Sequence, residues 1–304
     1  MTARAMQFVG VSTAGSSIHP VFTAWAPVLG LPDGARLVGV DLPLDATPGA
    51  YREVVAAMAD DPEVAGALVT THKIGLFSAC VDLFEHVSDD AAALGEVSCL
   101  VVRGGTVSAH ALDVTTSSLA LAAIEPDMAG RQVLIMGAGG AGKALMRHLV
   151  TRPDPPAGLT ITDTDGVRLA AAVDVAAVAG ATGLVRTVQV HGPQDDLVAA
   201  CGPGGLIVNA TGMGKDRGGS PISDAVIFPE RAIAWDFNYR GALSFLDQAR
   251  AQRESRSLTV EDGWTYFVHG WTRAIARVYD LDIPTDGPAF ENLSVVARDA
   301  RGIQ

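Results

Sequence analysis

The chain has 304 residues, of which 48% are hydrophobic and 18% charged, and its formal net charge is −12. This length and composition predict a two-domain globular protein, and the acidic balance argues against nucleic acid, because phosphate contacts need clustered Lys and Arg. No stretch reaches the roughly 18 apolar residues of a membrane-spanning helix, and Met1–Val9 lacks a signal-peptide core. Three scattered cysteines fit neither disulfide pairs nor a CxxC site. We expect a cytoplasmic protein that binds neither nucleic acid nor membranes.

In the first third of the chain, short β-like runs alternate with longer helical segments, which predicts a parallel sheet with crossover helices. The predicted strands are Gln7–Val11, Arg36–Leu42 and Ala65–Thr70, with a hairpin-like pair at Ser98–Val102 and Thr106–Ala111. The predicted helices are Ile18–Leu29, Ala50–Ala59, Ile74–Cys80 and, further on, about Thr116–Ile124. The breaker Glu125-Pro126-Asp127 that follows suits a domain boundary.

The alternation begins again after this breaker. The predicted strands are Val133–Met136, Leu159–Thr162, Thr187–His191, Leu206–Ala210 and Ala232–Phe237. The predicted helices are Lys143–Thr151, Val167–Ala179, Leu243–Gln252 and Gly263–Tyr279. The expected fold class is α/β with two domains, the second of them a Rossmann unit.

A glycine-rich turn carries the evidence for the Rossmann unit, because it lies between a predicted strand and a predicted helix. It consists of Gly137, Ala138, Gly139, Gly140, Ala141 and Gly142. In such a G-x-G-x-x-G turn, the first glycine permits the tight bend, the second lets the backbone approach a diphosphate, and the third allows close packing of helix on strand. The diphosphate then lies at the positive end of the helix. We predict that these six residues bind a dinucleotide, the alternative being a structural turn.

An acidic residue, Asp163, ends the next predicted strand, about 20 residues after Gly142. A carboxylate there accepts a hydrogen bond from the adenosine ribose and repels a 2′-phosphate, and neither Thr164 nor Asp165 is a cation that could bind one. We therefore predict NAD as the cofactor, with NADP the less favoured choice, and include Asp163 and Thr164 in its site. The alternative is that Asp163 or Asp165 only caps the next helix.

Two charged residues follow strands of the first part, Lys73 after Ala65–Thr70 and Asp113 after Thr106–Ala111. A hydride-transfer enzyme needs a group that moves the proton of the alcohol, and a lysine beside an aspartate can share protons with a substrate oxygen. We predict Lys73 and Asp113 as the catalytic residues. Taken singly, each of these residues is ordinarily a solvated surface charge.

Five segments together are similar to motifs of the shikimate/quinate dehydrogenase family, over roughly residues 6–280. In the first part of the chain, the V-T-x-P-x-K motif resembles Val69-Thr70-Thr71-His72-Lys73, the G-A-V-N-T motif resembles Gly95-Glu96-Val97-Ser98-Cys99, and the N-T-D-G segment contains Asp113. In the second part, the N-A-T segment resembles Asn209-Ala210-Thr211-Gly212-Met213, and the D-x-x-Y-x-P-x-x-T-x-L segment resembles Asp236–Leu246. The order of these motifs around a Rossmann turn makes the resemblance specific.

The resemblance implies an NAD(P)-dependent oxidoreductase that moves a hydride reversibly between nicotinamide and a hydroxyl or keto group of a small cyclic hydroxy acid. It implies a substrate-binding α/β domain at 1–115, completed by C-terminal helices at about 263–304, a Rossmann domain at 128–245, and a monomer or homodimer. Lys73 and Asp113 would face the nicotinamide across the cleft between the domains. The further cofactor residues implied are Asn209, Ala210, Thr211, Phe237 and Gly263. The substrate residues implied are Thr13, Ser16, Thr70, Ser98, Tyr239, His269 and Gly270.

Several of these positions depart from the family pattern. Thr13-Ala14-Gly15 aligns with the Ser-x-Ser that holds the substrate carboxylate, where Ser16 or Ser17 could substitute. The V-T-x-P-x-K segment lacks its proline, and side-chain amides are replaced at Ser98, Ala111 and Gly270. Each lost amide removes a hydrogen bond to a ring hydroxyl, worth about 1 kcal/mol. We therefore expect a hydroxy or keto acid other than shikimate as the substrate.

Three alternatives remain open at this point. The chain could be an ordinary shikimate or quinate dehydrogenase, or a dinucleotide-sensing protein without turnover. His72 could contact substrate or only stabilise the fold. No metal site is expected, because the seven histidines do not show the spacing of metal ligands. The sequence lacks the G-x-S-x-G motif of serine hydrolases, which argues against a hydrolase. The aromatic residues Trp264, Tyr266, Phe267 and Trp271 follow helical spacing, which favours core packing.

Overall fold

The computed structural model describes residues 5–215 and 218–302. Residues 1–4, 216–217 and 303–304 lie outside this description, and so do the outer ends of the predicted ranges 1–115 and 263–304. The chain forms two compact units, Met1–Leu112 with Val268–Gln304, and Asp113–Phe267. Within the described ranges, no helix combines the length and apolar character that crossing a membrane requires.

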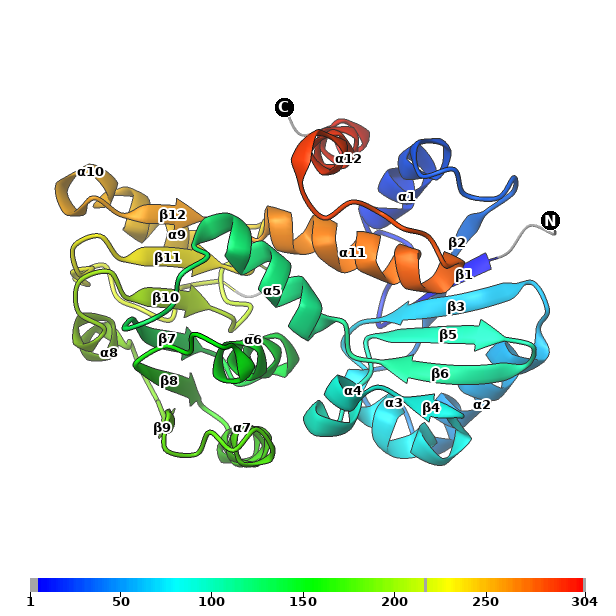
Figure 1. The fold of residues 1–304 in the computed structure, drawn as a ribbon, viewed down its shortest axis with the longest axis horizontal. Coiled ribbons are helices and arrows are strands. Elements are labelled where there is room, and N and C mark those ends of the chain that lie inside the picture. The colour runs from blue at the N-terminus through cyan, green and yellow to red at the C-terminus, as the bar shows by residue number, and fades with distance from the viewer. Residues whose placement is uncertain (1–4, 216–217, 303–304) are drawn as a thin grey trace. The chain divides into compact units, whose positions relative to one another are not determined.

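The first unit is built on a mixed sheet, with the strand order β2-β1-β3-β5-β6-β4 among the described residues. The strands are β1 (Ala5–Gly10), β2 (Arg36–Asp41), β3 (Val64–Val69), β4 (His86–Val87), β5 (Cys99–Arg103) and β6 (Thr106–His110). β1 pairs in parallel with β2 and β3, whereas β5 runs antiparallel to both β3 and β6 (Figure 1). The predicted parallel strands and the predicted hairpin thus form one sheet, in which the hairpin adds the antiparallel pairing.

Two helices of the first unit, α2 (Pro48–Asp60) and α4 (Asp89–Leu94), have residues at their ends that are typical of helix caps. The unit also contains α1 (Ile18–Val28), α3 (Lys73–Cys80), the 3₁₀ turn η1 (Val81–Leu83), α12 (Gly287–Ala300) and the part of α11 (Trp264–Tyr279) from Val268 on. Thr47 caps α2 by accepting a hydrogen bond from the backbone N–H of Ala50, and Pro48 follows in the first turn. Gly95, with φ of 62°, ends α4 in a left-handed conformation.

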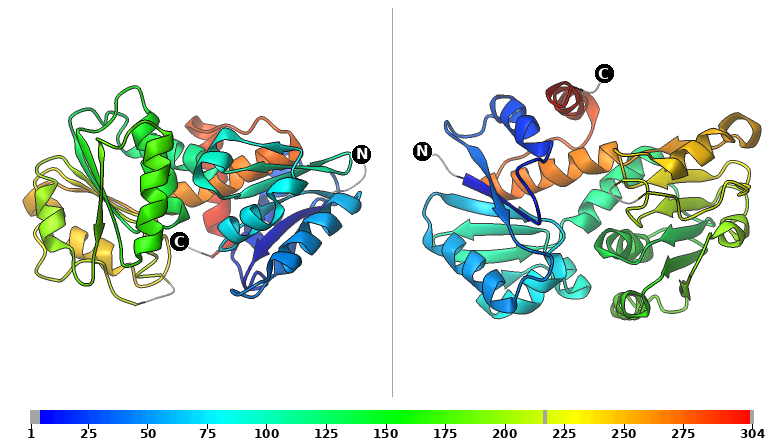
Figure 2. Two further views of the ribbon diagram at one scale, coloured as in Figure 1. Left: turned by 90° about the horizontal axis from the view of Figure 1, so that it is seen from below. Right: turned by 180° about the vertical axis from the view of Figure 1, so that it is seen from behind.

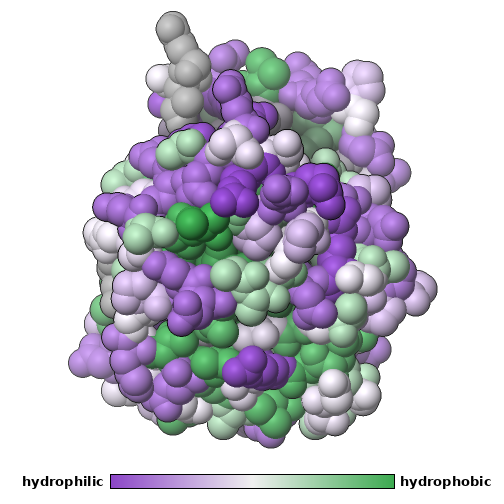
Figure 3. All heavy atoms as spheres, turned by 90° about the vertical axis from the view of Figure 1, so that its left-hand side faces the viewer, coloured by the Kyte–Doolittle hydropathy of each residue, from purple (hydrophilic) through white to green (hydrophobic). Residues whose placement is uncertain are grey.

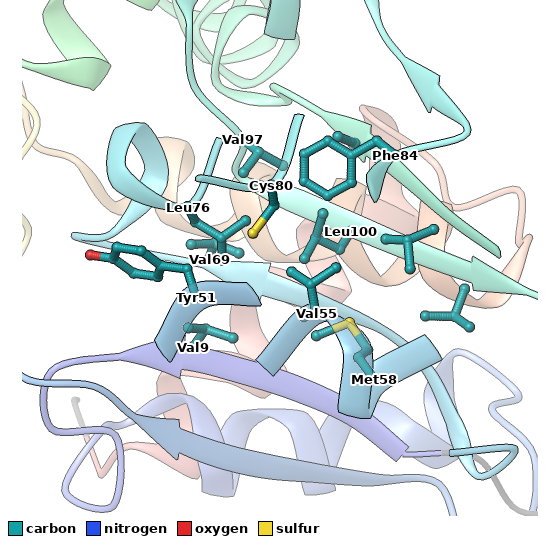
Figure 4. Close-up of a cluster of buried hydrophobic side chains, with 14 of the residues drawn as sticks. Val9, Tyr51, Val55, Met58, Val69, Leu76, Cys80, Phe84, Val97 and Leu100 are labelled. Carbon is teal, nitrogen blue, oxygen red and sulfur yellow. The ribbon is translucent and has the colours of Figure 1, made fainter. Parts of the chain in front are cut away.

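An apolar core fills the space between this sheet and helices α2 and α3 (Figure 4). Val55 and Met58 of α2 and Leu76 of α3 are at most 1% exposed. Burying one such side chain contributes about 1.5–3 kcal/mol. The core therefore holds α2 and α3 against the sheet, including β3 and β6, which lead to the candidate residues.

The second unit is a parallel sheet in the order β12-β11-β10-β7-β8-β9 among the described residues. Its strands are β7 (Gln132–Met136), β8 (Gly158–Asp163), β9 (Val185–Gln189), β10 (Leu206–Asn209), β11 (Ile233–Asp236) and β12 (Thr259–Glu261). Its helices are α5 (Asp113–Ile124), α6 (Gly140–Thr151), α7 (Gly166–Val178), α8 (Asp195–Ala200), α9 (Ser244–Arg250) and α10 (Arg253–Arg256). Counted from β7, this is the strand order of a Rossmann fold, and the predicted α/β fold class is confirmed.

Helices cover both faces of the parallel sheet (Figure 2). α8 and α9 pack on one face through Val198, Phe245 and Leu246, and α6 packs beside α5 and α7. The strand order reverses between β7 and β10, which is where open α/β sheets bind ligands, beyond the carboxyl ends of the strands. The glycine-rich turn follows β7, and Ala210 and Thr211 follow β10.

Figure 3 shows one face of the second unit, on which hydrophilic residues surround small groups of hydrophobic ones. The unit's exposed large apolar side chains include Val167, Val178 and Ile227. Isolated apolar side chains on a polar face are ordinary for a folded domain.

Candidate active site

The segments that lead to Lys73 and Asp113 leave the first sheet at the same edge. β3 and β6 both pair antiparallel with β5, so they run in the same direction and their C-terminal ends lie together. Ser98 joins the two segments: its carbonyl accepts from Val69 N at 2.8 Å and its N–H donates to His110 O at 2.9 Å. Its Oγ accepts from Leu112 N at 2.8 Å, which leaves the hydroxyl hydrogen able to donate.

Lys73 is the first residue of α3, one residue earlier than the predicted helix start, and is half-buried. Its carbonyl accepts a hydrogen bond from Val97 N at 3.2 Å. Thr70 donates to the carbonyl of Val9 both through its N–H, at 2.9 Å, and through its hydroxyl, at 3.3 Å. Asp113 directly follows Leu112 and begins α5, whereas the predicted helix began at Thr116. An acidic residue in the first turn suits the positive end of a helix.

Thr13 and Ser16 lie beyond the C-terminal end of β1. Thr13 donates through both its N–H and its hydroxyl to the same oxygen of Asp41, at 2.8 and 2.6 Å. These hydrogen bonds lower the pKa of the Asp41 carboxyl. The Ser16 hydroxyl accepts a long hydrogen bond of 3.5 Å from Ile18 N. No sequence signal points to Asp41, because its partner Thr13 lies 28 residues away in the loop after β1 and not at a fixed spacing.

His269 and Gly270 belong to the part of α11 that lies in the first unit. His269 is buried, and its ring stacks on Phe290 of α12 with centroids 4.2 Å apart. Burial, with a contribution from the nearby Arg273, lowers the pKa of His269 to about 4. At neutral pH this imidazole is therefore uncharged, and can offer a hydroxyl one donor and one acceptor. Gly270 is half-buried.

The glycine-rich turn has the shape that its three fingerprint glycines require. Gly137 has φ of 107°, and a Cβ there would lie 2.7 Å from the carbonyl group of Ala210. A Cβ on Gly142 would lie 1.9 Å from the carbonyl oxygen of Gly137. By contrast, no described atom lies within 4 Å of a Cβ built on Gly139, which is the N-cap of α6. Close packing explains the first and third glycines, and the open second one fits the approach of a diphosphate to the N–H groups of Gly140 and its neighbours.

Asp163 lies against this turn. Its Oδ2 accepts from Ala138 N at 2.9 Å, and its Oδ1 accepts from Asp165 N at 3.0 Å. The cap of α7 is Asp165, whose side chain accepts from Val167 N at 2.8 Å. The capping alternative therefore describes Asp165 and not Asp163. Arg168, which sequence reasoning missed, lies 3.8 Å from Asp163 and 3.7 Å from Asp165, so two carboxylates share its charge. Thr164 is exposed, and its carbonyl accepts from Gln189 Nε2.

A buried polar network shapes the loop after β10. Asn209 Nδ2 donates to Asp236 Oδ2 at 3.0 Å, and Asn209 Oδ1 accepts from the Thr211 hydroxyl at 2.6 Å. Asn238 donates through its N–H to Asp236 Oδ1 and through Nδ2 to the carbonyl of Met213. Burial raises the pKa of Asp236 to about 6. The sequence motif indicated Asn209 and Thr211, but not that Asp236 and Asn238 hold their loop.

Phe237, Tyr239 and Gly263 meet the first turn of α11 within the second unit. The Phe237 ring stacks on Tyr266 at 4.6 Å, and Tyr239 packs on Phe267 at 4.6 Å. A Cβ on Gly263 would lie 2.1 Å from the Phe237 carbonyl oxygen, so only glycine allows this approach. Among the described residues, no group of three or more His, Cys, Asp or Glu side chains could hold a metal ion.

The chain is similar to shikimate and quinate dehydrogenases of known sequence and structure. A shikimate dehydrogenase (NADP(+)) from Methylobacterium radiotolerans is 30% identical over 268 residues, covering 86% of each chain. One from Symbiobacterium thermophilum is 30% identical over 195 residues, and the match spans 63% of that protein. The solved structure of quinate dehydrogenase from Corynebacterium glutamicum in complex with NAD has a TM-score of 0.76 at 21% identity, covering 97% of this chain and 98% of that one. No protein-family model matches the chain.

The fold, the glycine-rich turn and these relatives define an NAD(P)-dependent oxidoreductase that acts on CH–OH groups. Within that class, the chain belongs to the shikimate/quinate dehydrogenase family. The resemblance found in the sequence motifs is thereby confirmed.

Proposed function

We propose that the protein is an NAD(H)-dependent dehydrogenase that interconverts a hydroxyl and a keto group on a small cyclic hydroxy or keto acid other than shikimate. The observation that carries the proposal is the arrangement at the edge of the first sheet, where Ser98 ties the β3–α3 turn that ends in Lys73 to Leu112, the residue before Asp113. Family membership supplies the reaction class. In this proposal residues 1–115 with 263–304 bind substrate and 128–245 bind the dinucleotide.

The proton of the reacting hydroxyl is handled by Lys73. As an ammonium it donates to the oxygen of a ketone, and as an amine it accepts the proton of an alcohol. Asp113 binds and orients the reacting hydroxyl. The dinucleotide, when bound, supplies or accepts the hydride. Replacing Lys73 with methionine should lower kcat by orders of magnitude and leave NAD affinity unchanged. Activity like that of the wild type would refute this role.

The preference for NAD over NADP follows from the carboxylates at the end of β8. Asp163 is buried against the glycine-rich turn, where its position suits the ribose hydroxyls, and Arg168 is already shared by Asp163 and Asp165. A 2′-phosphate placed there would meet two carboxylates and one shared guanidinium. The residues present thus fit NAD(H), with the diphosphate at the turn and the ribose at Asp163 and Thr164.

The test compares kcat/KM with NAD and NADP in the wild type and in Asp163→Asn. The variant keeps the side-chain shape but loses the charge, so it should lose NAD efficiency and gain NADP efficiency. Asp174→Asn is the matched control, because it removes an equal charge from an exposed position in the middle of α7 and not from the turn. Preference of the wild type for NADP would contradict the proposal.

The substrate is proposed to differ from shikimate because the side chains at the predicted clamps cannot make the same hydrogen bonds. Thr13 donates both of its hydrogen bonds to Asp41, and Gly270 has no side chain. Ordinary shikimate or quinate turnover, which the relatives' names indicate, is the second candidate. A screen of hydroxy acids with NAD that follows NADH formation decides between them. A protein that binds NAD but turns over no compound would instead be a dinucleotide sensor.

A further inference from the structure

A buried chain of hydrogen bonds runs through His72, the residue before Lys73. The ring is 3% exposed, its Nε2 lies 3.1 Å from the carbonyl oxygen of Leu42, and its Nδ1 lies 2.9 Å from the hydroxyl of Tyr51. A carbonyl oxygen only accepts, so Nε2 carries a proton, and Nδ1 of the neutral ring then accepts from Tyr51. Both ring nitrogens are therefore used inside the protein. Of the two roles left open by the sequence, this geometry favours the structural one.

Three separate segments of the first unit meet at this ring. Leu42 follows β2, Tyr51 lies in the first turns of α2, and His72 precedes α3. Figure 4 shows Tyr51 beside Leu76 and Val69 at one end of the apolar cluster, with its hydroxyl directed away from the cluster. Burial raises the pKa of the Tyr51 phenol, which keeps it a hydrogen-bond donor. A Cβ on Gly75 would lie 2.9 Å from the Tyr51 hydroxyl, so α3 carries glycine where the phenol crosses it.

The turn held in this way has a strained backbone. Thr71 has φ of 33°, a left-handed conformation that β-branched residues rarely adopt and that costs about 1–3 kcal/mol. Such a conformation persists only where the surroundings enforce it. The proline of the similar V-T-x-P-x-K segment, which would restrict the backbone, is missing from Val69–Lys73. The hydrogen bonds of His72 supply a restraint directly after the strained residue.

We propose that Tyr51 and His72 are positioning residues for Lys73. The chain Leu42–His72–Tyr51 fixes the turn that presents the Lys73 side chain, and so sets where its ammonium group lies and how accessible it is. The importance of this for turnover rests on the proposed proton transfer by Lys73. The positioning itself concerns only the fold of the first unit and can be measured without a substrate.

Four variants separate positioning from stability. Tyr51→Phe removes one hydroxyl and leaves the ring in the core. His72→Ala removes both hydrogen bonds, whereas His72→Asn keeps an oxygen near the place of Nδ1 that can accept from Tyr51. Val55→Ala is the matched control, because Val55 lies one turn after Tyr51 on α2 in the same apolar cluster and has no hydrogen bond to the turn. This substitution destabilises the unit but leaves the hydrogen bonds of Leu42, His72 and Tyr51 in place.

The first measurement needs no substrate. The acylation rate of Lys73 by an N-hydroxysuccinimide acetate is followed by peptide mass spectrometry, with Lys215 of the second unit as the internal reference. Release of the turn should raise the relative rate at Lys73 at least about threefold in Tyr51→Phe and more in His72→Ala. His72→Asn should recover part of the wild-type rate, and Val55→Ala should leave it unchanged. Equal relative rates in wild type, Tyr51→Phe and His72→Ala would overturn the proposal.

The second measurement is turnover of the compound that the NADH screen identifies. Loss of the Tyr51 hydroxyl should lower kcat about tenfold and change KM little, because a displaced proton donor affects the chemical step. Val55→Ala, assayed well below its melting temperature, should keep the wild-type kcat. If Lys73→Met retains full turnover, the proposed function fails, whereas the acylation rates still decide the positioning. If Tyr51→Phe has both the wild-type acylation rate and the wild-type kcat, the positioning role of Tyr51 and His72 is refuted, while the proposed function of Lys73 stands.

Discussion

The Oγ of Ser98 accepts a hydrogen bond from the backbone N–H of Leu112 at 2.8 Å, directly before Asp113. The same serine binds Val69 and His110 through its backbone. One buried residue between β3 and β6 thus connects the segments that carry both proposed catalytic groups. The family motif has asparagine at this position. The serine hydroxyl still accepts the hydrogen bond from Leu112 N, but the serine side chain is shorter than asparagine and extends less far towards a substrate.

Replacing Ser98 with alanine should destabilise the protein by about 1–3 kcal/mol, because Leu112 N–H loses its acceptor. The chain leading to Asp113 is then less restrained, so kcat should also fall. Urea unfolding and steady-state kinetics measure the two effects. Ser78→Ala, on the exposed side of α3, is the control and should behave like the wild type. An unchanged free energy of unfolding in Ser98→Ala would contradict the assigned hydrogen bond.

The glycine-rich turn offers a pair of substitutions with opposite outcomes. Gly142→Ala places a Cβ 1.9 Å from the Gly137 carbonyl oxygen, so the second unit should lose stability. Gly139→Ala meets no described atom within 4 Å, so its melting temperature should match the wild type. Its NADH affinity should nevertheless fall at least about tenfold, because the methyl group occupies the approach of the diphosphate. Thermal unfolding and NADH fluorescence titration check both. Full affinity in Gly139→Ala would place the diphosphate elsewhere.

The parts of the molecule that the sequence predicted well are those defined by local pattern. The apolar strands around the glycine-rich turn and the helix that follows depend on residues close in sequence, so β7, β8 and α6 were expected nearly at their observed bounds. His86–Val87 is too short to show a pattern, and β4 exists only because it pairs with β6. α4 was missed too, although Ser88 at its start is an ordinary helix cap.

The contacts that define the candidate site were less accessible to sequence reasoning. Thr13 with Asp41 and Tyr51 with His72 join residues on different strands and helices, and no spacing rule relates them. Asp163 illustrates the same limit, since its distance from the turn was expected but its bond to Ala138 N was not. Sequence pattern thus predicts the elements and the residue types at their ends. Tertiary packing decides which of those side chains remain for a ligand.

Asp236 should make the stability of the second unit depend on pH. Burial raises its pKa in the folded protein to about 6, above the value of 3.8 for an exposed carboxyl. The folded state therefore binds the proton more tightly, and the stabilisation by the protonated form is full below pH 3.8 and lost as the pH rises through about 6. Relative to Asp236→Asn, the wild type should lose up to about 3 kcal/mol between these limits. Urea unfolding across that range measures the difference, and a constant difference would rule the effect out.

Gly263 should tolerate no side chain, because it lies against the backbone at the end of β11. A Cβ there would lie 2.1 Å from the carbonyl oxygen of Phe237 and 2.4 Å from its carbonyl carbon, and backbone atoms cannot rotate away as a side chain can. Gly263→Ala should therefore cost about 1–3 kcal/mol of unfolding free energy and weaken NADH binding by displacing Phe237. Gly183→Ala is the control in the same unit, since its Cβ meets no described atom within 4 Å and should leave stability equal or slightly higher. Equal melting temperatures for the two variants would show that β11 and α11 are not held at this distance.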